Sequence, residues 1–447
     1  MKTVLIFAHE CAPYQRPQSM VGAQRPAQFA KYLGEFGWRA VVLCADNARR
    51  GQTNHPQALS DARADVQRAL AKTAPDAPVI IPTPALAYDG WADRAWRATF
   101  KEGSPQPHKL TVTARKALTA AKIRSGDWSQ PWQPCARAAA EVITQNIKID
   151  AVVGEHSPDA GLFLAHWFHA RYGTPWLADF RDPMPQGFQG GARRWYTAQG
   201  RKLTSTAAGT INVTPYWAEL DKEMFGRPAW CLPNGFDPSE FPATTDATPH
   251  TPYYEIIYAG NIIPSQRLAI FLEGLQQARL ALGADLGDKL RFVYRGGAHQ
   301  QVAREAEQAG VADLTDSTPP IPRLASLARL QQAQTLLLLS IAHPEQEDVY
   351  FRRGYYPAKT FEYFGAQRPI LCVPGDGGLL DELLRTTRAG EICRTAAQVA
   401  GYLADAVRAW DAHNPSGYQP DTVAIAGYTR RNLTGQLAAL LDNIRHK

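Results

Sequence analysis

The stretch Tyr355-Tyr-Pro-Ala-Lys-Thr-Phe-Glu-Tyr-Phe-Gly-Ala-Gln-Arg-Pro-Ile-Leu-Cys-Val-Pro374 is the most informative part of this chain. Lys359 and Glu362 stand three residues apart at the start of an amphipathic pattern. On a helix, two such positions lie on one face. The apolar run Pro369–Val373 follows at once and is typical of a buried parallel strand. The stretch therefore predicts a helix that leads directly into the strand of an α/β sheet.

The start of this predicted helix is a candidate anion site. A helix N-terminus carries partial positive charge and free N–H groups, which suit a phosphate. We predict that Lys359 binds a phosphate group and that Glu362 accepts hydrogen bonds from a ribose diol. The alternative is an ordinary surface ion pair between the two side chains, which contributes little to stability.

Strand-like and helix-like patterns alternate along the rest of the chain, which is typical of doubly wound parallel sheets. Because 447 residues are too many for one core, we predict two Rossmann-like domains that face each other across a cleft. The expected divisions are an N-terminal domain, a proline-rich linker, a C-terminal domain and a final helical segment, over 1–236, 237–252, 253–425 and 426–447. Asn47–Asp76 is polar and is assigned neither strand nor helix.

Composition excludes several other classes of protein. The hydrophobic content of 45% is ordinary for a globular protein, and no run of 18 apolar residues is present. The apolar run Val4–Ala8 is too short for a signal peptide. The six cysteines are scattered without metal-binding spacing, so we predict reduced thiols and a cytoplasmic protein.

The net charge of +6 is concentrated in one segment, Trp91–Arg124. This basic segment has eight lysines and arginines against two acidic residues, interleaved with Trp96 and Phe100. Cations with interfacial aromatic rings suit an anionic membrane surface. A solvated loop is the alternative. We expect no nucleic-acid partner, because the chain has no nucleic-acid-binding motif.

Four further blocks bear on the family. They are Met20–Leu33 with the following Gly37–Leu43, Trp176–Pro183 with its Asp-Phe-Arg-Asp-Pro, Leu232-Pro-Asn-Gly-Phe-Asp237, and Ile257-Tyr-Ala-Gly-Asn261. Together with Tyr355–Pro374, and in this order, they resemble GT-B glycosyltransferases of family four, of the bacterial polysaccharide type, over roughly the whole chain. The resemblance implies that the final helix crosses back to the N-terminal domain.

The resemblance also implies an activity. It indicates a retaining hexosyltransferase of surface polysaccharide or glycoconjugate biosynthesis, with a nucleotide-sugar donor, UDP favoured over GDP, and a glycan or lipid-linked acceptor. No cofactor is expected. The chain contains no Asp-x-Asp, the carboxylate pair that binds a metal on the donor diphosphate in another fold class. We therefore predict a metal-independent enzyme, in which cationic side chains bind the diphosphate.

In the first domain, the resemblance assigns Gly22 and His156 to the site, and Asp182 is a further candidate from its place after a predicted strand. Gly22 lies in a turn that approaches the donor phosphates or the acceptor, and His156 contacts the transferred sugar. Asp182 orients or deprotonates an acceptor hydroxyl; alternatively, Asp179 and Asp182 form an ion-pair network around Arg181.

In the second domain, Gly260 and Asn261 follow a predicted strand, but Asn261 and Gln266 stand where the family has cations. Arg267 and Arg295 are the expected substitutes, with Arg267 and Lys359 as catalytic cations. Gly296 belongs to a Rossmann-type turn, and Tyr363 belongs to the family's glutamate–tyrosine pair. These predicted donor-binding residues are Gly22, Gly260, Asn261, Arg295, Gly296, Lys359, Glu362 and Tyr363.

One acidic residue of the family pattern is missing. Gly354 stands where the family has a glutamate that contacts the donor sugar, and His343, Glu345, Glu347 or Asp348 are candidates to replace it. Two alternatives therefore stay open: a non-catalytic protein that binds nucleotides or glycans, and a sugar-nucleotide epimerase or phosphorylase on the same fold.

Overall fold

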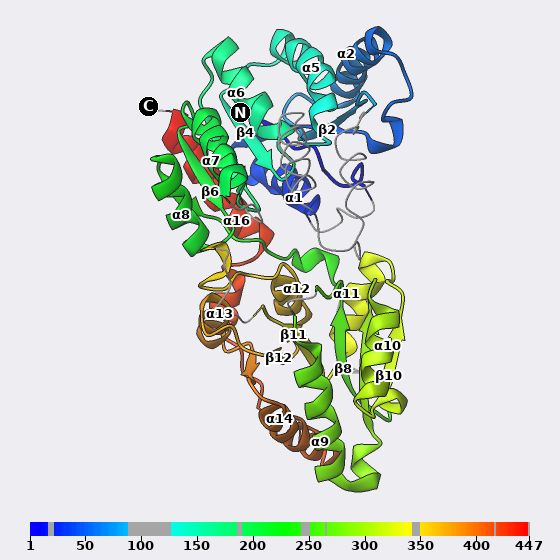
Figure 1. Ribbon diagram of the computed structural model, residues 1–447. Helices are drawn as coiled ribbons and strands as arrows, with labels where there is room; N and C mark the ends of the chain where they lie inside the picture. Colours follow the sequence, from blue (N-terminus) through cyan, green and yellow to red (C-terminus); the bar gives the residue numbers. More distant parts are fainter. Residues whose placement is uncertain are drawn as a thin grey trace, which may run out of the picture. The chain divides into compact units, whose positions relative to one another are not determined.

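The computed structural model describes residues 1–16, 22–87, 127–185, 190–242, 251–263, 266–341, 349–414 and 417–445. The chain forms two compact units. The first unit comprises Met1–Pro233 and Leu433–Lys447, and the second comprises Asn234–Asn432 (Figure 1). The second unit is therefore inserted between two parts of the first.

The first unit is built on a seven-stranded parallel sheet with the order β3-β2-β1-β4-β5-β6-β7. Its strands are β1 (Lys2–Phe7), β2 (Trp38–Ala45), β3 (Val79–Thr83), β4 (Ala151–His156), β5 (Trp176–Phe180), β6 (Gly209–Asn212) and β7 (Ala229–Cys231). Its helices are α1 (Gln24–Tyr32), α2 (His55–Lys72), α5 (Gln133–Asn146), α6 (Ala160–Tyr172), α7 (Gly190–Thr204), α8 (Pro215–Phe225) and α16 (Arg430–Arg445), the last beginning at the edge of the second unit.

Both faces of this sheet are buried, which explains why its strands are continuously apolar. Every residue of β2 is buried, and Val4 of β1 is in register with Ala40 on one side and Ala151 on the other. Helices α2, α5, α6 and α7 supply apolar side chains to the core on one face. Helices α1 and α16 cover the other face, where Leu437 and Leu441 of α16 are buried.

The second unit repeats this architecture with a six-stranded parallel sheet in the order β10-β9-β8-β11-β12-β13. Its strands are β8 (Tyr254–Ala259), β9 (Leu290–Arg295), β10 (Thr315–Thr318), β11 (Thr335–Leu339), β12 (Ile370–Val373) and β13 (Gly390–Ile392). Its helices are α9 (Leu268–Gly287), α10 (His299–Gln308), α11 (Arg323–Gln332), α12 (Lys359–Ala366), α13 (Leu379–Thr387), α14 (Ala396–Asp411) and α15 (Thr422–Ala426).

Close helix packing supports one face of the second sheet. Helices α9 and α14 lie against each other (Figure 1), and Gly274 of α9 leaves no room for a side chain because Val399 of α14 lies against it. The opposite face is closed by a second apolar cluster that includes Phe361 and Phe364 of α12.

The predicted fold class, two doubly wound parallel sheets, is confirmed. Several helices were not predicted, among them α2, which lies within the polar stretch Asn47–Asp76. Residues 17–21, the basic segment Trp91–Arg124, residues 243–250 of the predicted linker and residues 342–348 lie outside the described residues. Within the described part, no helix is long and apolar enough to cross a membrane.

Candidate functional site

The strand order of the second unit identifies where a ligand binds. The order reverses between β8 and β11, and open α/β sheets bind ligands beyond the carboxyl ends of the strands at such a switch point. Gly260 and Asn261 directly follow β8, and Lys359 of α12 reaches the same place. The switch point therefore gathers several of the predicted donor-binding residues.

Two glycines allow the backbones after β8 and β9 to meet. Gly260 has a φ of +119°, which disfavours any side chain there, and its carbonyl oxygen accepts a 2.9 Å hydrogen bond from the Tyr294 hydroxyl. A Cβ atom on Gly296 would clash with the carbonyl oxygen of Gly260 and with the Tyr294 hydroxyl. Glycine at both positions thus keeps the floor of the site free of side chains.

Lys359, the first residue of α12, places its ammonium group at this floor. Its Nζ atom lies 3.6 Å from the centroid of the Tyr258 ring and 3.3 Å from where a Cβ atom on Gly260 would be. The Nζ atom is buried and has no hydrogen-bond partner among the described residues. Burial lowers the pKa of Lys359 from 10.5 to about 7. An unpaired, dehydrated cation beside a helix N-terminus is suited to bind an anion.

Glu362 is bound by a different partner from Lys359. Its carboxylate accepts a 3.1 Å hydrogen bond from Arg323, and the same guanidinium lies 2.9 Å from Glu240. Burial raises the pKa of Glu362, and Arg323 partly offsets that effect. The hydrogen-bonded ion pair between Lys359 and Glu362, the alternative left open by the sequence, is not formed, since the ammonium group makes no hydrogen bond to any described residue.

The other predicted cations of this unit lie differently. Arg267 is exposed at the N-cap of α9. The guanidinium of Arg295 lies 2.5 Å from the carboxylate of Asp316 on the edge strand β10. Of the three predicted cations, Lys359 has its charge at the glycine floor.

The structure explains why glutamine stands at position 266, where the family has a cation. Asn261 is exposed, and its backbone carbonyl accepts a 2.9 Å hydrogen bond from the Tyr258 hydroxyl. Gln266 is buried, donates to the Leu339 carbonyl over 2.7 Å and accepts from the Ile263 amide over 3.0 Å. Gln266 therefore fixes the loop after β8 to the end of β11.

The expected donor contact of Tyr363 needs correction. Its side chain is fully buried in the core under α12, and its hydroxyl donates a 3.0 Å hydrogen bond to the Leu337 carbonyl of β11. Tyr363 anchors the helix to the sheet. Sequence reasoning instead missed Tyr258 and Arg323, which contact Lys359 and Glu362. The one available signal was that Tyr258 is the penultimate residue of a predicted strand at the switch point.

The first unit has its own cluster of functional groups at the end of β4. His156 is buried, and its Nδ1 atom lies 2.8 Å from the carboxylate of Asp159. Burial alone would lower the pKa of His156, but the carboxylate of Asp159 outweighs this effect and raises it, with Asp182 contributing. Asp182 itself is exposed, just beyond β5. A buried imidazole that is oriented by a carboxylate can form a hydrogen bond with a sugar hydroxyl.

Asp179 belongs to a buried group of ion pairs nearby, and Gly22 packs against an arginine of this group. Asp179 forms a two-point pair with Arg25, over 2.8 and 2.9 Å, and both side chains are buried. The guanidinium of Arg181 lies against Gly22, leaving no room for a Cβ atom, and is 3.3 Å from the carboxylate of Glu155. Burial raises the pKa of Glu155 to about 7. The ion-pair network that the sequence suggested around Arg181 is formed differently, because Asp179 pairs with Arg25 and Arg181 lies beside Glu155.

Comparisons with known proteins show which fold this chain has. No family model and no curated protein sequence matches the chain. It is similar in structure to sucrose-phosphate synthase from Thermosynechococcus elongatus, with a TM-score of 0.58, 10% identity, and 99% of each chain covered. It is also similar to Anabaena HepE solved with UDP and glucose (TM-score 0.58, 10% identity, 99% of this chain and 100% of that one).

A third similar structure is the α,α-trehalose 6-phosphate synthase from Burkholderia multivorans, with a TM-score of 0.58, 11% identity, and coverage of 100% of this chain and 97% of that one. These similarities extend over essentially the whole chain and show that it has the GT-B fold. At such low identity they establish the fold alone, so the chemistry must be argued from this chain's own residues.

Proposed function

We propose that the chain is a glycosyltransferase that binds a nucleotide-sugar donor, UDP-sugar before GDP-sugar, at the switch point of its second unit. One observation carries this proposal: the buried ammonium of Lys359 has no hydrogen-bond partner among the residues described, and it lies beside Gly260 at the start of α12. A donor diphosphate would supply the missing anionic partner. HepE of Anabaena, which shares the fold, was solved with UDP-glucose, and this supports the choice of base.

In this arrangement, two side chains bind different parts of the donor. Lys359 would bind the diphosphate, where Asn261 and Gln266 supply no charge, and exposed Arg267 would add a second cation. Glu362, oriented by Arg323, would accept hydrogen bonds from the ribose hydroxyls. Negative charge grows on the diphosphate as the sugar departs, so fixed cations lower the barrier to transfer.

We assign the acceptor to the first unit. The imidazole of His156, oriented by Asp159, would form a hydrogen bond with a hydroxyl of the transferred hexose. Exposed Asp182 would orient the acceptor hydroxyl. The proposed acceptor is a glycan or lipid-linked glycan of surface polysaccharide or glycoconjugate biosynthesis. We propose that the reaction retains the anomeric configuration and needs no metal, since the chain has no Asp-x-Asp.

The first test is ligand-induced stabilisation. UDP, GDP and dTDP, then the corresponding nucleotide sugars, are added to the full chain while its thermal unfolding is followed. A donor at 100 times its Kd should stabilise the protein by about 2.7 kcal/mol. If no nucleotide stabilises the chain, the donor site is refuted.

The second test separates transfer from the rival activities. The nucleotide sugar that stabilises best is incubated with glycan and lipid-linked acceptors, and the products are analysed. Free nucleotide with a glycosylated acceptor supports a transferase. An isomerised nucleotide sugar would instead show an epimerase, and tight binding without turnover on any acceptor would show a non-catalytic binding protein.

A further inference from the structure

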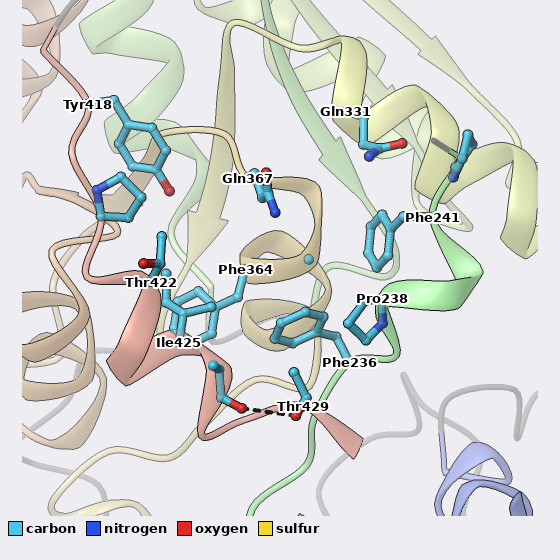
Figure 2. Close-up of a pocket in the computed structure, with 14 residues that line it drawn as sticks. Phe236, Pro238, Phe241, Gln331, Phe364, Gln367, Tyr418, Thr422, Ile425 and Thr429 are labelled. Atoms are coloured by element: carbon cyan, nitrogen blue, oxygen red, sulfur yellow. Dashed lines mark hydrogen bonds between the residues drawn. The ribbon is translucent and has the colours of Figure 1, made fainter. Parts of the chain in front are cut away.

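The second unit contains a cavity of about 580 Å³ that the proposed reaction does not use. Its lining comes from three parts of the second unit: the segment Phe236–Pro242, the α11–α12 region, and the segment Tyr418–Thr429 (Figure 2). Its volume lies within the range of about 300–1,000 Å³ that is usual for small-molecule sites. Lys359 and Glu362 are not among its lining residues.

Aromatic rings form much of its wall. Phe236, Phe241 and Phe364 line the cavity (Figure 2). Phe236 and Phe241 also pack edge to face, with ring centroids 6.4 Å apart. Gly365 is required there, because a Cβ atom on it would clash with the rings of Phe241 and Phe236. The packing of α12 thus holds these rings in fixed positions.

Neutral polar groups complete the lining. The hydroxyl oxygen of Tyr418 is buried and has no hydrogen-bond partner within the described residues. The amide side chains of Gln331 and Gln367 and the hydroxyl of Thr422 project from the same walls (Figure 2). All the lining residues are uncharged.

This combination selects among classes of ligand. A charged ligand would be dehydrated without a counter-charge, which is costly. A purely apolar ligand would leave the buried Tyr418 hydroxyl without a hydrogen-bond partner, which is unfavourable. A sugar ring has hydroxyls that both donate and accept, as amide and hydroxyl side chains do, and C–H faces that pack on aromatic rings.

We propose that this cavity is a binding site for a neutral saccharide. It is separate from the proposed donor site, so it stands or falls independently of the transferase assignment. Its walls also include the segments that connect the second unit to the rest of the chain. Phe236 pairs with Thr429 in a parallel bridge, and the Arg430 amide donates to the Phe236 carbonyl over 2.7 Å. A saccharide bound here would contact both connecting segments.

The test is calorimetric titration of the full chain, in the presence of saturating UDP, with uncharged mono- and disaccharides. Ala426 is exposed and lines the cavity, so Ala426→Phe should fill it without disturbing the core. Val423 lies on the same helix, is 84% exposed and does not line the cavity, so Val423→Phe is the matched control. Tyr418→Phe removes the unpaired hydroxyl alone.

We expect saturable binding of at least one saccharide, abolished by Ala426→Phe, weakened about tenfold by Tyr418→Phe and unchanged in Val423→Phe. UDP affinity and far-UV circular dichroism should be the same in all four proteins, which shows that the variants fold. The proposal is overturned if no saccharide binds, if Ala426→Phe and Val423→Phe bind equally well, or if UDP displaces the saccharide. Should UDP itself fail to bind, the titration without UDP still tests this cavity.

Discussion

Replacing Lys359 by methionine should make the unliganded protein more stable and the nucleotide affinity lower. At about 1.36 kcal/mol for each pKa unit, lowering the pKa from 10.5 to about 7 disfavours the ammonium form by roughly 5 kcal/mol at most. Methionine keeps the apolar stem over Tyr258 and removes the buried charge. Replacing a buried ion pair by apolar side chains is often neutral or stabilises a protein by about 1–4 kcal/mol, and we expect a gain of that order from removing this unpaired charge.

The pH dependence of this gain follows from the direction of the shift. The folded protein binds the Lys359 proton less tightly than the unfolded chain does, so wild-type stability rises with pH between about 7 and 10.5. The advantage of Lys359→Met is therefore complete below about pH 7 and disappears as the pH approaches 10.5. Urea unfolding at about pH 6 and about pH 10 measures it directly.

Binding should change in the opposite direction. Loss of one charge-assisted hydrogen bond, about 1.5–3 kcal/mol, should weaken UDP binding by about 10- to 150-fold. If transfer is observed, turnover should fall by a further factor of about 100–1,000, because the cation acts most strongly on the departing diphosphate. Isothermal titration and single-turnover kinetics separate the two effects.

The matched control is Lys289→Met in the same unit. Lys289 pairs with Asp411 at the surface over 2.6 Å, and such pairs contribute about 0–1 kcal/mol, so stability and UDP affinity should hardly change. The reasoning about Lys359 is refuted if Lys359→Met is less stable than the wild type without UDP while its UDP affinity is unchanged. Lys359 would then be a structural residue.

Four further outcomes are expected. Transfer should survive EDTA; an activity lost on chelation and restored by magnesium or manganese would contradict the proposed cation-based mechanism. Glu362→Gln should weaken nucleotide binding more than turnover, since ribose hydroxyls change little during the reaction, and a purely kcat effect would argue otherwise. Replacing Arg94, Arg97 and Lys101 by glutamate should abolish salt-sensitive binding to anionic liposomes, whereas equal binding would make the basic segment a solvated loop. Burial raises the pKa of Asp221 to about 7, so wild-type stability should fall as pH rises from about 4 to 7; Asp221→Asn should flatten this slope in urea titrations and gain about 1–3 kcal/mol above pH 7.

The sequence predicted the buried strands well. The apolar run Pro369–Val373 was expected to be a buried strand, and β12 covers Ile370–Val373 of it, because an uninterrupted apolar run has few other places to lie in an α/β protein. Helix α2 was missed for the converse reason. Its buried face consists of Ala58, Ala62 and Val66, small residues four apart, and the rest of the helix is polar. The buried and exposed positions of this helix differ too little in hydrophobicity for the helical period to be visible in the sequence.

The candidate site was predicted less completely, because helical spacing shows which face a residue is on and not what that face meets. Lys359 and Glu362 were expected to act together, yet one lies over Tyr258 and the other binds Arg323. These partners are distant in sequence. Tyr363 is adjacent to Glu362 in sequence, but its side chain points about 100° away around the helix and enters the core. The position of Glu362 therefore did not predict the burial of Tyr363.

The insertion of the second unit has a consequence for the order in which the protein is made. The first unit's sheet is translated early, but α16, which covers one of its apolar faces, leaves the ribosome only after the whole second unit. Until then, Trp38 and the strands beside it lack the leucines that bury them. The second unit, a continuous stretch from Asn234 to Asn432, has no such dependence and can close its core first. The nascent first unit therefore stays aggregation-prone while the second unit is synthesised, and removal of Leu433–Lys447 exposes that face permanently.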